Sequence, residues 1–589
     1  MSTQLLARAS GGATRRRNRY APGIDGLRAL AVLAVFGYHA GIPGFRGGFL
    51  GVDIFFVISG YLITDLLVAE RQRTGTIDLR EFWLRRARRL LPALAVMLVV
   101  ITAAAVLIDR AQLAGLRGDL IAAATYTSNW HQISAHTSYF AQFGPQPLLL
   151  HLWSLAVEEQ FYLLWPLILL VLPRFLRLHG RQAMLLLAGA VASTVAMGIA
   201  YTPGTDPSRL YYGTDTHAAG LLIGATLALL LAGRRPAIDA AGGCCLGGLL
   251  LIVVLAGDSG SFVYRGGFLL VAVLAAGAVA ATAAPGGLLG QLLGVAPLRW
   301  LGTRSYAIYL WHWPLLCLLR APGHHPLRIA AALGLSLLLA ELSWRLVEDP
   351  IRRQGLLATL TSVRDVLPLR SAPIPRLVAG GSAVAVALVA CVGVALPAPT
   401  DGAKAQIEAG EKVVTAQRPP PPRPTRTAPA LPGTGVTAVG DSVMLASASA
   451  LRARLPGIAI SAQIGRQMST ATQIVATLRS NGRLGSVVVI DLGTNGEFTQ
   501  STLARLMDTI GPTRKVVLLT VYEPRGWQDA VNGAIESAPS HWSNVTVVDW
   551  HAAIAHRQQL LWTDHIHPRP AGAKLYAQLV TAALPRSVR

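Results

Sequence analysis

Two ionisable side chains, Arg28 and His39, lie within the first apolar stretch of this 589-residue chain, residues 24–40. Ionisable groups inside a hydrocarbon layer are costly unless they face a protein interior or a wet cavity, so they indicate function by default. Eleven helical residues make about three turns and rise roughly 16 Å, which places both side chains on one face at different depths. This spacing predicts one helix that carries a fixed cation and a proton-exchanging imidazole along a common lining.

Further charged residues lie in or beside the next apolar stretches: Asp53 in the second, Arg85, Arg86, Arg88 and Arg89 at the mouth of the third, and Glu158 and Glu159 in the fourth. Planar guanidiniums suit phosphate groups, although the charge alone fits a topology anchor equally well. Consecutive helical positions point about 100° apart, so at most one of the two glutamates is expected to face the cavity that holds His39.

A second set of polar clusters lies in the last 150 or so residues: Gly440-Asp441-Ser442, Gly465-Arg466, Gly493-Thr494-Asn495, and Asp564 to His567. A hydroxyl nucleophile needs a base, a carboxylate that orients the base, and donors aimed at the developing oxyanion. Ser442, His567 and Asp564 fit the first three roles, and the amides of Ser442 and Gly465 with the Asn495 side chain fit the last. A lone Gly-Asp-Ser is usually an ordinary turn, but four such clusters in order favour catalysis.

The elements that must position these residues are mostly membrane helices. The chain is 52% hydrophobic and 14% charged, with a mean hydropathy of +0.46, whereas soluble domains carry about 25% charged residues. Apolar stretches predict about eleven spans: 24–40, 49–69, 90–108, 152–172, 183–201, 217–232, 246–257, 266–284, 300–319, 327–347 and 376–396. Residues 119–130 start apolar but end Thr-Ser-Asn-Trp, which predicts a re-entrant or external segment.

The net charge of +22 and the pI of about 10.7 do not indicate nucleic-acid binding. The arginines fall in alternate loops of the predicted spans, as the positive-inside rule requires, so we expect a cytoplasmic N-terminus and an external region after about residue 397. The basic head shows no cleavage pattern of a signal peptide. The four cysteines lie in or directly beside predicted spans, so no disulfide framework is implied. The composition, with Arg in place of Lys, is typical of a GC-rich bacterium, and we expect a bacterial plasma membrane.

The predicted organisation has five parts: a basic cytoplasmic N-terminus (1–22), a membrane domain (23–355), a cytoplasmic loop with the last span (356–396), a Pro-rich linker (397–435) and an external domain (436–589). The linker composition favours extended polyproline geometry and a semi-rigid spacer. In the external domain, short β-branched runs at 436–439, 487–492, 516–521 and 545–548 alternate with helical stretches such as 442–455, 471–479 and 571–584. This alternation predicts an α/β domain with a parallel sheet, whose active site lies at the carboxyl ends of the strands.

The motifs of residues 20–355 resemble the acyltransferase family 3 membrane domain. They are Arg28 with His39, the block Gly51–Tyr61, the Arg-rich mouth, the block Trp153–Tyr162, the block Ser305–Pro314 and Glu348-Asp349-Pro350. The resemblance implies acyl transfer from a cytoplasmic acyl-CoA to a hydroxyl of an envelope glycan or glycolipid. His39 would be base or transient acyl carrier, with Arg28, Asp53, the four arginines and the two glutamates along the path. His217 departs from the family, because it stands where an arginine is expected.

Residues 436–589 resemble the SGNH hydrolase and acyltransferase family, a three-layer, flavodoxin-like α/β fold. Its four named residues would be Ser442, Gly465, Asn495 and His567. His565 is a rival base, but the family pattern places an Asp three residues before the His, which selects Asp564 and His567.

Together the two resemblances predict a membrane O-acyltransferase. The donor would be acetyl-CoA or succinyl-CoA, the acceptor a cell-wall polysaccharide or glycolipid, and the surroundings membrane lipid; no metal and no permanently bound cofactor are expected. Two other classes remain open. A transporter or flippase also needs intramembrane charges, but it should show matching broken halves, which we do not see. An acyl exporter whose external domain is an esterase would use the same triad with water as acceptor.

Overall fold

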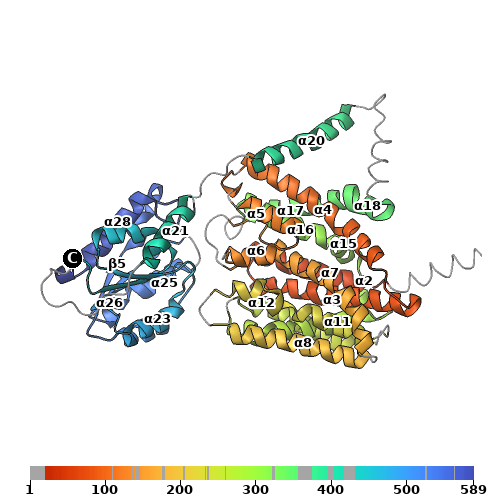
Figure 1. Cartoon of the computed structure of the whole chain (residues 1–589), viewed down its shortest axis with the longest axis horizontal. Coiled ribbons are helices and arrows are strands. Elements are labelled where there is room, and N and C mark those ends of the chain that lie inside the picture. The colour runs from red at the N-terminus through yellow and green to blue at the C-terminus, as the bar shows by residue number, and fades with distance from the viewer. Residues whose placement is uncertain are drawn as a thin grey trace, which may run out of the picture. The chain divides into compact units, whose positions relative to one another are not determined.

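The computed structural model divides the chain into two compact units, one within residues 1–398 and the other mostly within 399–589 (Figure 1). The structure describes residues 20–108, 110–113, 115–135, 137–140, 146–175, 179–202, 206–231, 234, 238–258, 260–321, 326–355, 374–395, 402–416, 431–523, 527–562 and 564–588. The arginines at 15–19 and the prolines at 419–424 lie outside the described residues. Each unit is considered by itself below.

The first unit is helical, and each predicted span contains a helix. The long helices are α2 (Pro22–His39), α3 (Gly51–Thr74), α4 (Leu79–Ile108), α7 (Leu152–Phe175), α8 (His179–Ala200), α11 (Ala219–Leu231), α12 (Asp239–Leu255), α13 (Phe268–Thr282), α16 (Ser305–Leu318), α17 (Pro326–Ser343) and α20 (Ile374–Ala395). Short helices join them: α9 (Ser208–Tyr212), α10 (Thr214–His217), α14 (Leu288–Leu293), α15 (Ala296–Thr303) and α18 (Asp349–Gln354).

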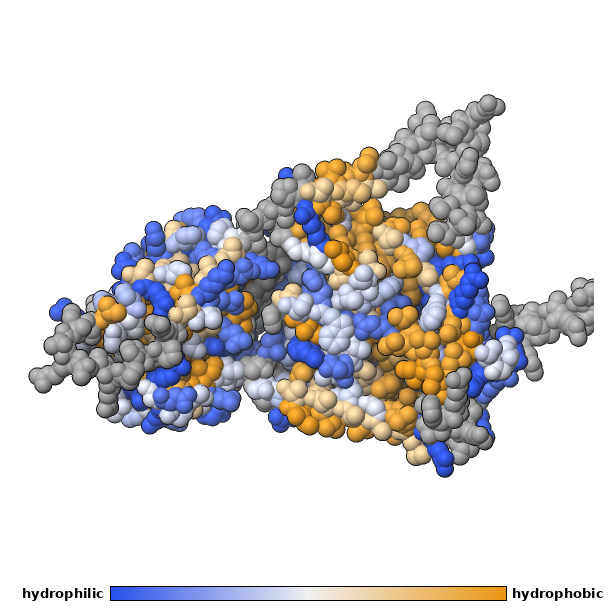
Figure 2. Space-filling view, viewed as in Figure 1, coloured by the Kyte–Doolittle hydropathy of each residue, from blue (hydrophilic) through white to orange (hydrophobic). Residues whose placement is uncertain are grey.

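Six helices among the described residues are long and apolar enough to cross a membrane, counting continuous helical runs: Gly48–Thr74, Leu79–Ile108, Leu152–Val171, Gly180–Ala200, Val263–Thr282 and Pro326–Gln354. Large apolar side chains such as Leu107, Ile199 and Leu327 are exposed on this unit, and Figure 2 shows apolar surface gathered over its helices. Such exposure suits side chains that face lipid rather than water. The full count of eleven spans and their orientation stay predictions.

Residues 119–130 do not form a span-length helix. They fall in two short helices, α5 (Leu116–Ala124) and α6 (Ser128–Ser134), separated by Tyr126 at φ 53°. Nine helical residues rise only about 14 Å, roughly half of the hydrocarbon thickness.

Glycines allow α3 to pack closely against its neighbours. A Cβ at Gly60 would lie 2.1 Å from the carbonyl oxygen of Leu221 in α11, and one at Gly224 would lie 2.1 Å from that of Val57 in α3. On its other side, a Cβ at Gly51 would lie 2.5 Å from the carbonyl oxygen of Ala31 in α2. Small residues permit such contacts between membrane helices. They fix α3 between α2, which bears Arg28, and α11, which begins two residues after His217.

The second unit is a parallel five-stranded sheet in the order β2-β1-β3-β4-β5, covered by helices on both faces. Its strands are β1 (Val436–Gly440), β2 (Ala459–Ala462), β3 (Val487–Asp491), β4 (Lys515–Leu519) and β5 (Val545–Val548). Its main helices are α22 (Ser442–Arg454), α23 (Met468–Ser480), α24 (Gln500–Ile510), α25 (Gln528–Glu536), α27 (Trp550–Ala555) and α28 (Pro570–Ala583). The predicted three-layer α/β architecture is confirmed, and this strand order is the flavodoxin-like one.

Alternating side chains of the buried strands supply two separate cores. Val487 and Val489 pack with residues of α22 and α28, whereas Val488 and Ile490 pack with residues of α23 and α24. Successive side chains of a strand point to opposite faces, so one apolar run serves both layers.

Part of the predicted linker is a helix of the second unit. Residues 402–415 form α21 (Gly402–Thr415), which packs on α22: a Cβ at Gly410 would lie 1.9 Å from the carbonyl oxygen of Leu445. The expected spacer over 397–435 is therefore wrong for this stretch. Its Ala, Glu and Lys residues favour a helix, and its apolar residues Ile407 and Ala403 are buried.

Candidate functional site

The carboxyl ends of β1 and β3 bring two of the predicted polar clusters together. Gly440 at the end of β1 pairs in register with Asp491 at the end of β3. Ser442 follows β1 as the first residue of α22, and Asp441 caps that helix by accepting the Val443 N–H at 2.9 Å. Because parallel strands end at one edge, the loops after β1 and β3 meet there.

Ser442, His567 and Asp564 form a continuous hydrogen-bonded chain. His567 Nε2 lies 2.8 Å from Ser442 Oγ, and His567 Nδ1 lies 2.8 Å from Asp564 Oδ2. An ionised carboxylate only accepts, so the His567 proton sits on Nδ1 and the lone pair on Nε2 accepts the serine hydroxyl. The geometry is that of a nucleophile, a base and the group that orients the base.

Asp564 is held as an ionised acceptor by the turn that it starts. Its Oδ1 accepts the N–H groups of Ile566 at 2.9 Å and His567 at 3.0 Å. Burial alone would raise the pKa of Asp564, but the bonds from the His567 ring and these two N–H groups lower it below its usual value. The carboxylate therefore stays charged at neutral pH.

His565, the rival base, is exposed and adopts a left-handed backbone conformation, φ 58°. It lies at the tip of the turn whose ends carry Asp564 and His567, and His567 is the imidazole that contacts Ser442.

The predicted oxyanion donors surround the same end of the sheet. Ser442, as first residue of α22, has an N–H without an intrahelical partner, and Gly465 has φ +72°, a conformation that side-chain-bearing residues rarely adopt. Asn495 Nδ2 donates to Asp441 Oδ2 at 2.9 Å. A carboxamide nitrogen carries two hydrogens, so this bond leaves the second for an incoming oxyanion.

Sequence reasoning gave no role to two buried carboxylates at this end of the sheet, Asp441 and Asp491. Burial raises the pKa of Asp441 to about 6, although the bonds from Val443 and Asn495 oppose the shift. Burial and the neighbouring Asp441 also raise the pKa of Asp491, which accepts the Tyr576 hydroxyl at 2.6 Å. In the sequence, the one signal that could have identified Asp491 as a site residue is its position at the end of an apolar strand.

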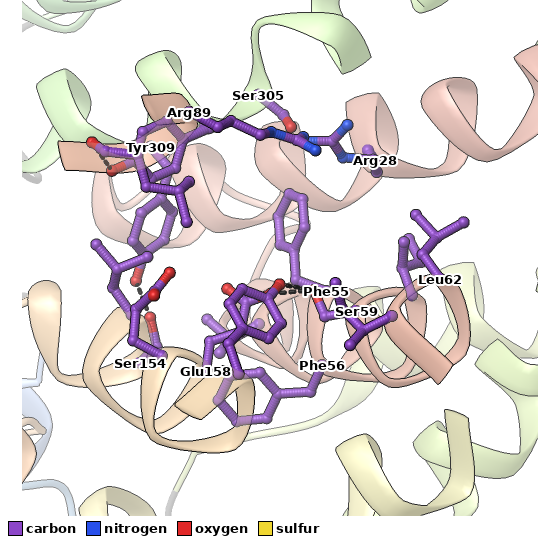
Figure 3. Close-up of a pocket in the computed structure, with 18 of the residues that line it drawn as sticks. Arg28, Phe55, Phe56, Ser59, Leu62, Arg89, Ser154, Glu158, Ser305 and Tyr309 are labelled. Atoms are coloured by element: carbon purple, nitrogen blue, oxygen red, sulfur yellow. Dashed lines mark hydrogen bonds between the residues drawn. The ribbon is translucent and has the colours of Figure 1, made fainter. Parts of the chain in front are cut away.

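In the helical unit, a cavity is lined by residues of five helices, α2, α3, α4, α7 and α16, and its charged residues come from α2, α4 and α7 (Figure 3). Arg28 and Arg89 lie on one side of it, and Ser59 and Glu158 on the other. Arg86 and Glu159 also line it. The aromatic and hydroxyl part of the lining comprises Phe55, Phe56, Tyr162, Ser154, Ser305, Tyr306 and Tyr309. The cavity therefore offers three guanidiniums for an anion beside two carboxylates.

Both glutamates line this cavity, whereas at most one was expected to face a cavity shared with His39, which does not line this one. Glu158 accepts from Ser59 and, at 2.8 Å, from the Tyr162 hydroxyl. Glu159 Oε1 is buried and has no hydrogen-bond partner among the described atoms. The two side chains point about 100° apart around the axis of α7, and this angle is small enough for both to reach the same cavity.

Of the four predicted arginines at the mouth of α4, only Arg86 and Arg89 line the cavity. Arg85 pairs with Glu81 at 3.2 Å and with Glu70 at 3.6 Å, and Arg88 is exposed. Residues three apart share a helix face, whereas their neighbours point elsewhere. The four arginines thus form two pairs: Arg86 and Arg89 line the cavity, and Arg85 and Arg88 lie outside it.

Asp53 does not line the cavity but pairs with the unexpected His217. His217 Nε2 lies 2.8 Å from Asp53 Oδ1, and His217 Nδ1 lies 2.6 Å from the carbonyl oxygen of Tyr211. Both ring nitrogens face acceptors, an arrangement that a doubly protonated imidazolium satisfies. In that form His217 supplies the positive charge for which an arginine was expected.

His39 and Arg28 do not share a lining, contrary to expectation. Arg28 lines the cavity, whereas His39 ends α2, is buried and contacts the side chains of His312 and Trp313. The rise of roughly 16 Å between them carries His39 beyond the cavity. Tyr309 stands between: its side chain lines the cavity, and its carbonyl oxygen lies 2.7 Å from His312 Nδ1.

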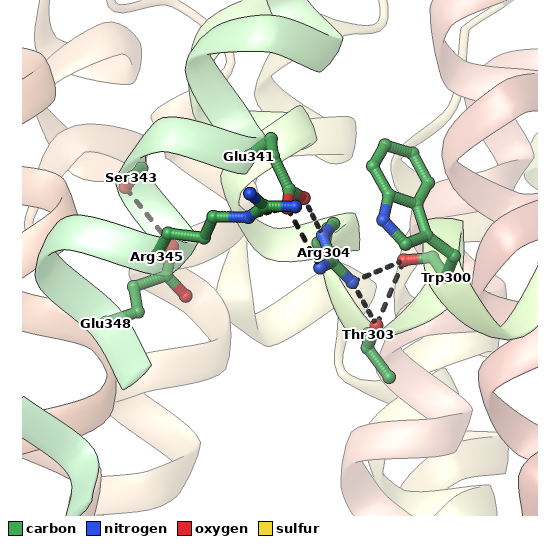
Figure 4. Close-up of polar contacts among 7 residues, drawn as sticks. All are labelled: Trp300, Thr303, Arg304, Glu341, Ser343, Arg345 and Glu348. Atoms are coloured by element: carbon green, nitrogen blue, oxygen red, sulfur yellow. Dashed lines mark hydrogen bonds and ion pairs between the residues drawn. The ribbon is translucent and has the colours of Figure 1, made fainter. Parts of the chain in front are cut away.

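A second cavity continues from the first, because Arg28, Leu62 and Arg89 line both. Its other lining residues are Tyr20, Asp25, Thr303, Trp344, Glu348 and Arg352. Beside it, Arg304 pairs with Glu341, which also pairs with Arg345, and Ser343 donates to Glu348 at 3.2 Å (Figure 4). The Arg304 guanidinium lies 4.7 Å from the Trp300 ring centre and 5.5 Å from that of Trp344. These contacts brace the helices that wall the second cavity.

Residues 22–344 match the family model described as an acyltransferase domain, acyltransferase family 3. The chain is 36% identical to the peptidoglycan O-acetyltransferase OatA of Listeria monocytogenes, over 97% of this chain and 99% of the relative. It is 35% identical to the putative peptidoglycan O-acetyltransferase YrhL of Bacillus subtilis, over 97% and 99%, and 34% identical to the O-acetyltransferase OatA of Staphylococcus aureus, over 96% of each.

Among solved structures, the catalytic C-terminal domain of the peptidoglycan O-acetyltransferase OatA of Streptococcus pneumoniae, with a methylsulfonyl adduct, matches with a TM-score of 0.24 and 28% identity. The match covers 26% of this chain and 93% of that one.

Proposed function

Because this chain belongs to acyltransferase family 3, we propose that it moves an acetyl group from cytoplasmic acetyl-CoA through its helical unit to a hydroxyl of peptidoglycan. The acceptor is inferred from relatives that match along almost the whole chain and are named for peptidoglycan. The observation that carries the proposal is the Ser442–His567–Asp564 chain, with both contacts at 2.8 Å, in the unit joined to the membrane acyltransferase domain.

The proposed chemistry has two stages. In the helical unit, the acyl–sulfur bond of the thioester breaks and CoA leaves as its thiol, while the acyl group bonds to His39 as transient carrier or to a carrier whose proton His39 takes as base. In the second unit, His567 takes the Ser442 proton as Ser442 Oγ attacks the acyl carbon; the bond from that carbon to its carrier breaks, His567 gives the proton to the departing carrier, and an acyl-serine forms. A sugar hydroxyl then displaces the serine and gives its proton to His567, which returns it to Ser442. The donors at Gly465, Asn495 and the Ser442 N–H stabilise the oxyanion in both steps.

Mass spectrometry of muropeptides tests the proposal directly. Cells that express the chain are expected to carry ester-linked acetyl groups on glycan sugars, and cells without it are not. Ester groups with the mass of succinate would overturn the acetyl assignment, and acylation of another envelope glycan alone would overturn the peptidoglycan assignment.

The cavity arginines are expected to bind the phosphates of the donor. Arg86→Ala and Arg89→Ala should each weaken acetyl-CoA binding by about 10- to 100-fold, because a hydrogen bond to a charged group is worth about 1.5–3 kcal/mol. Isothermal titration of the purified full-length protein measures this change.

Arg85→Ala is the matched control, because its guanidinium pairs with Glu70 and Glu81 outside the cavity. It removes the same charge from the same helix end and should change binding by less than about 3-fold, as is usual for exposed pairs. Equal losses in all three variants, or altered orientation in reporter fusions with unchanged affinity, would favour the topology anchor instead.

A further inference from the structure

A second imidazole faces His39 from the motif Ser305–Pro314. His312 lies on α16 and is fully buried, and its Nε2 is 2.9 Å from His39 Nδ1. The two rings are nearly parallel, 20° apart, with centres separated by 5.1 Å. This contact joins residues 273 positions apart in the chain.

The surroundings of His312 fix which of its nitrogens carries the proton. His312 Nδ1 lies 2.7 Å from the carbonyl oxygen of Tyr309. A carbonyl only accepts, so Nδ1 must be the donor, and in a neutral ring the lone pair is then on Nε2. The opposite tautomer would set a ring lone pair against the carbonyl lone pairs.

The tautomer of His312 determines that of His39. The lone pair of His312 Nε2 faces His39 Nδ1, so His39 Nδ1 must carry its proton, and the lone pair of His39 lies on Nε2. Among the residues that the structure describes, the titratable groups in contact with His312 are His39, His151, whose ring centre is 5.6 Å away, and Tyr309. None of these is a carboxylate that would pair with a buried imidazolium, and an unpaired buried charge is costly, so neutral rings satisfy this chain best.

We propose that His312 is the positioning residue of His39, which fixes the His39 proton on Nδ1 and presents Nε2 as the reacting nitrogen. The proposal rests on the proposed role of His39 in acyl transfer and adds to it the atom that reacts. His312 itself forms no bond to the acyl group and exchanges no proton with it. The arrangement parallels the second unit, where Asp564 does the same for His567, but it uses a neutral acceptor in place of a carboxylate.

The test compares two replacements of His312 in the full-length protein in cells. His312→Phe keeps an aromatic ring but removes the acceptor, and the initial rate of glycan acylation should fall about 100-fold or more, as when a base is lost or held in the wrong tautomer. His312→Gln restores one acceptor and one donor, and its rate should recover to within about 10-fold of wild type. Phe36→Leu, which changes only apolar packing near the His312 ring, is the matched control and should retain most of the rate.

A double variant shows whether His312 acts through His39. His39→Ala with His312→Phe should be no slower than His39→Ala alone, since residues that act as a unit are strongly non-additive. Wild-type rates in His312→Phe, a His312→Gln variant as inactive as His312→Phe at equal membrane abundance, or a further loss in the double variant would each overturn the inference. An active His39→Ala variant would instead overturn the proposed function of His39 itself.

Discussion

Replacing Ser442 with alanine is expected to reduce the ester-linked acetyl content of the glycan to background. Ser442 Oγ is the atom that His567 Nε2 contacts, at 2.8 Å, and removal of a triad nucleophile lowers turnover by about 10⁶-fold in enzymes that use this geometry. In the proposed mechanism, acyl groups would still leave the helical unit, but the last covalent carrier would be missing. Alkaline release and quantification of acetate from purified glycan measures the effect.

The direction of the change separates transfer from hydrolysis. If the second unit were an esterase, the Ser442→Ala variant would leave more acetyl groups on the glycan, because removal would stop while installation continued. His567→Ala and Asp564→Ala should shift the content in the same direction as Ser442→Ala, the Asp564 change less severely. Ser447→Ala, another buried serine of α22, is the matched control and should change nothing. A rise in acetate for Ser442→Ala would sink the transfer mechanism.

The second large effect is expected at His39. His39→Ala should abolish glycan acylation while the protein stays in the membrane, because loss of a general base costs about 10²- to 10⁴-fold and no other imidazole in the described part of the chain has its nitrogens placed in the same way. His131→Ala, a histidine of α6 that lies beside Asp119 at 3.4 Å, is the control and should retain acylation. Acylation at the wild-type level in the His39→Ala variant, at equal abundance, would refute a role for His39.

The sequence predicted the elements well because their signals are local. Apolar runs set the positions of the long helices, and β-branched runs set those of β1, β3, β4 and β5. The triad followed from clusters that each close a strand or precede a helix, and the turn from Asp564 to His567 is itself a local hydrogen-bonded unit. β2 is short and only partly buried, and its run Ala459–Ala462 carries little apolar signal.

Which residues would face the cavity could not be derived, because that depends on helix rotation and on contacts between distant segments. Arg86 and Arg89 are indistinguishable from Arg85 and Arg88 until α4 is packed. Likewise, the contact of His39 with His312 joins opposite ends of the membrane domain, and no periodicity within either helix encodes it.

Helix α21 gives the second unit a brace at its catalytic edge. The Gln406 amide donates to the carbonyl oxygens of Ala446, at 2.7 Å, and Pro568, at 2.9 Å, and it accepts the Trp562 N–H at 3.2 Å. One side chain thus joins the helix that begins at Ser442 to the loop that carries His567. α21 precedes the prolines in the chain. A protease that cut within 417–430 would therefore break the covalent link between α21 and the rest of the second unit, which would stay bound to α21 through these contacts. For the same reason, a soluble fragment that starts after the prolines would lose this brace, and one that starts at residue 402 would keep it.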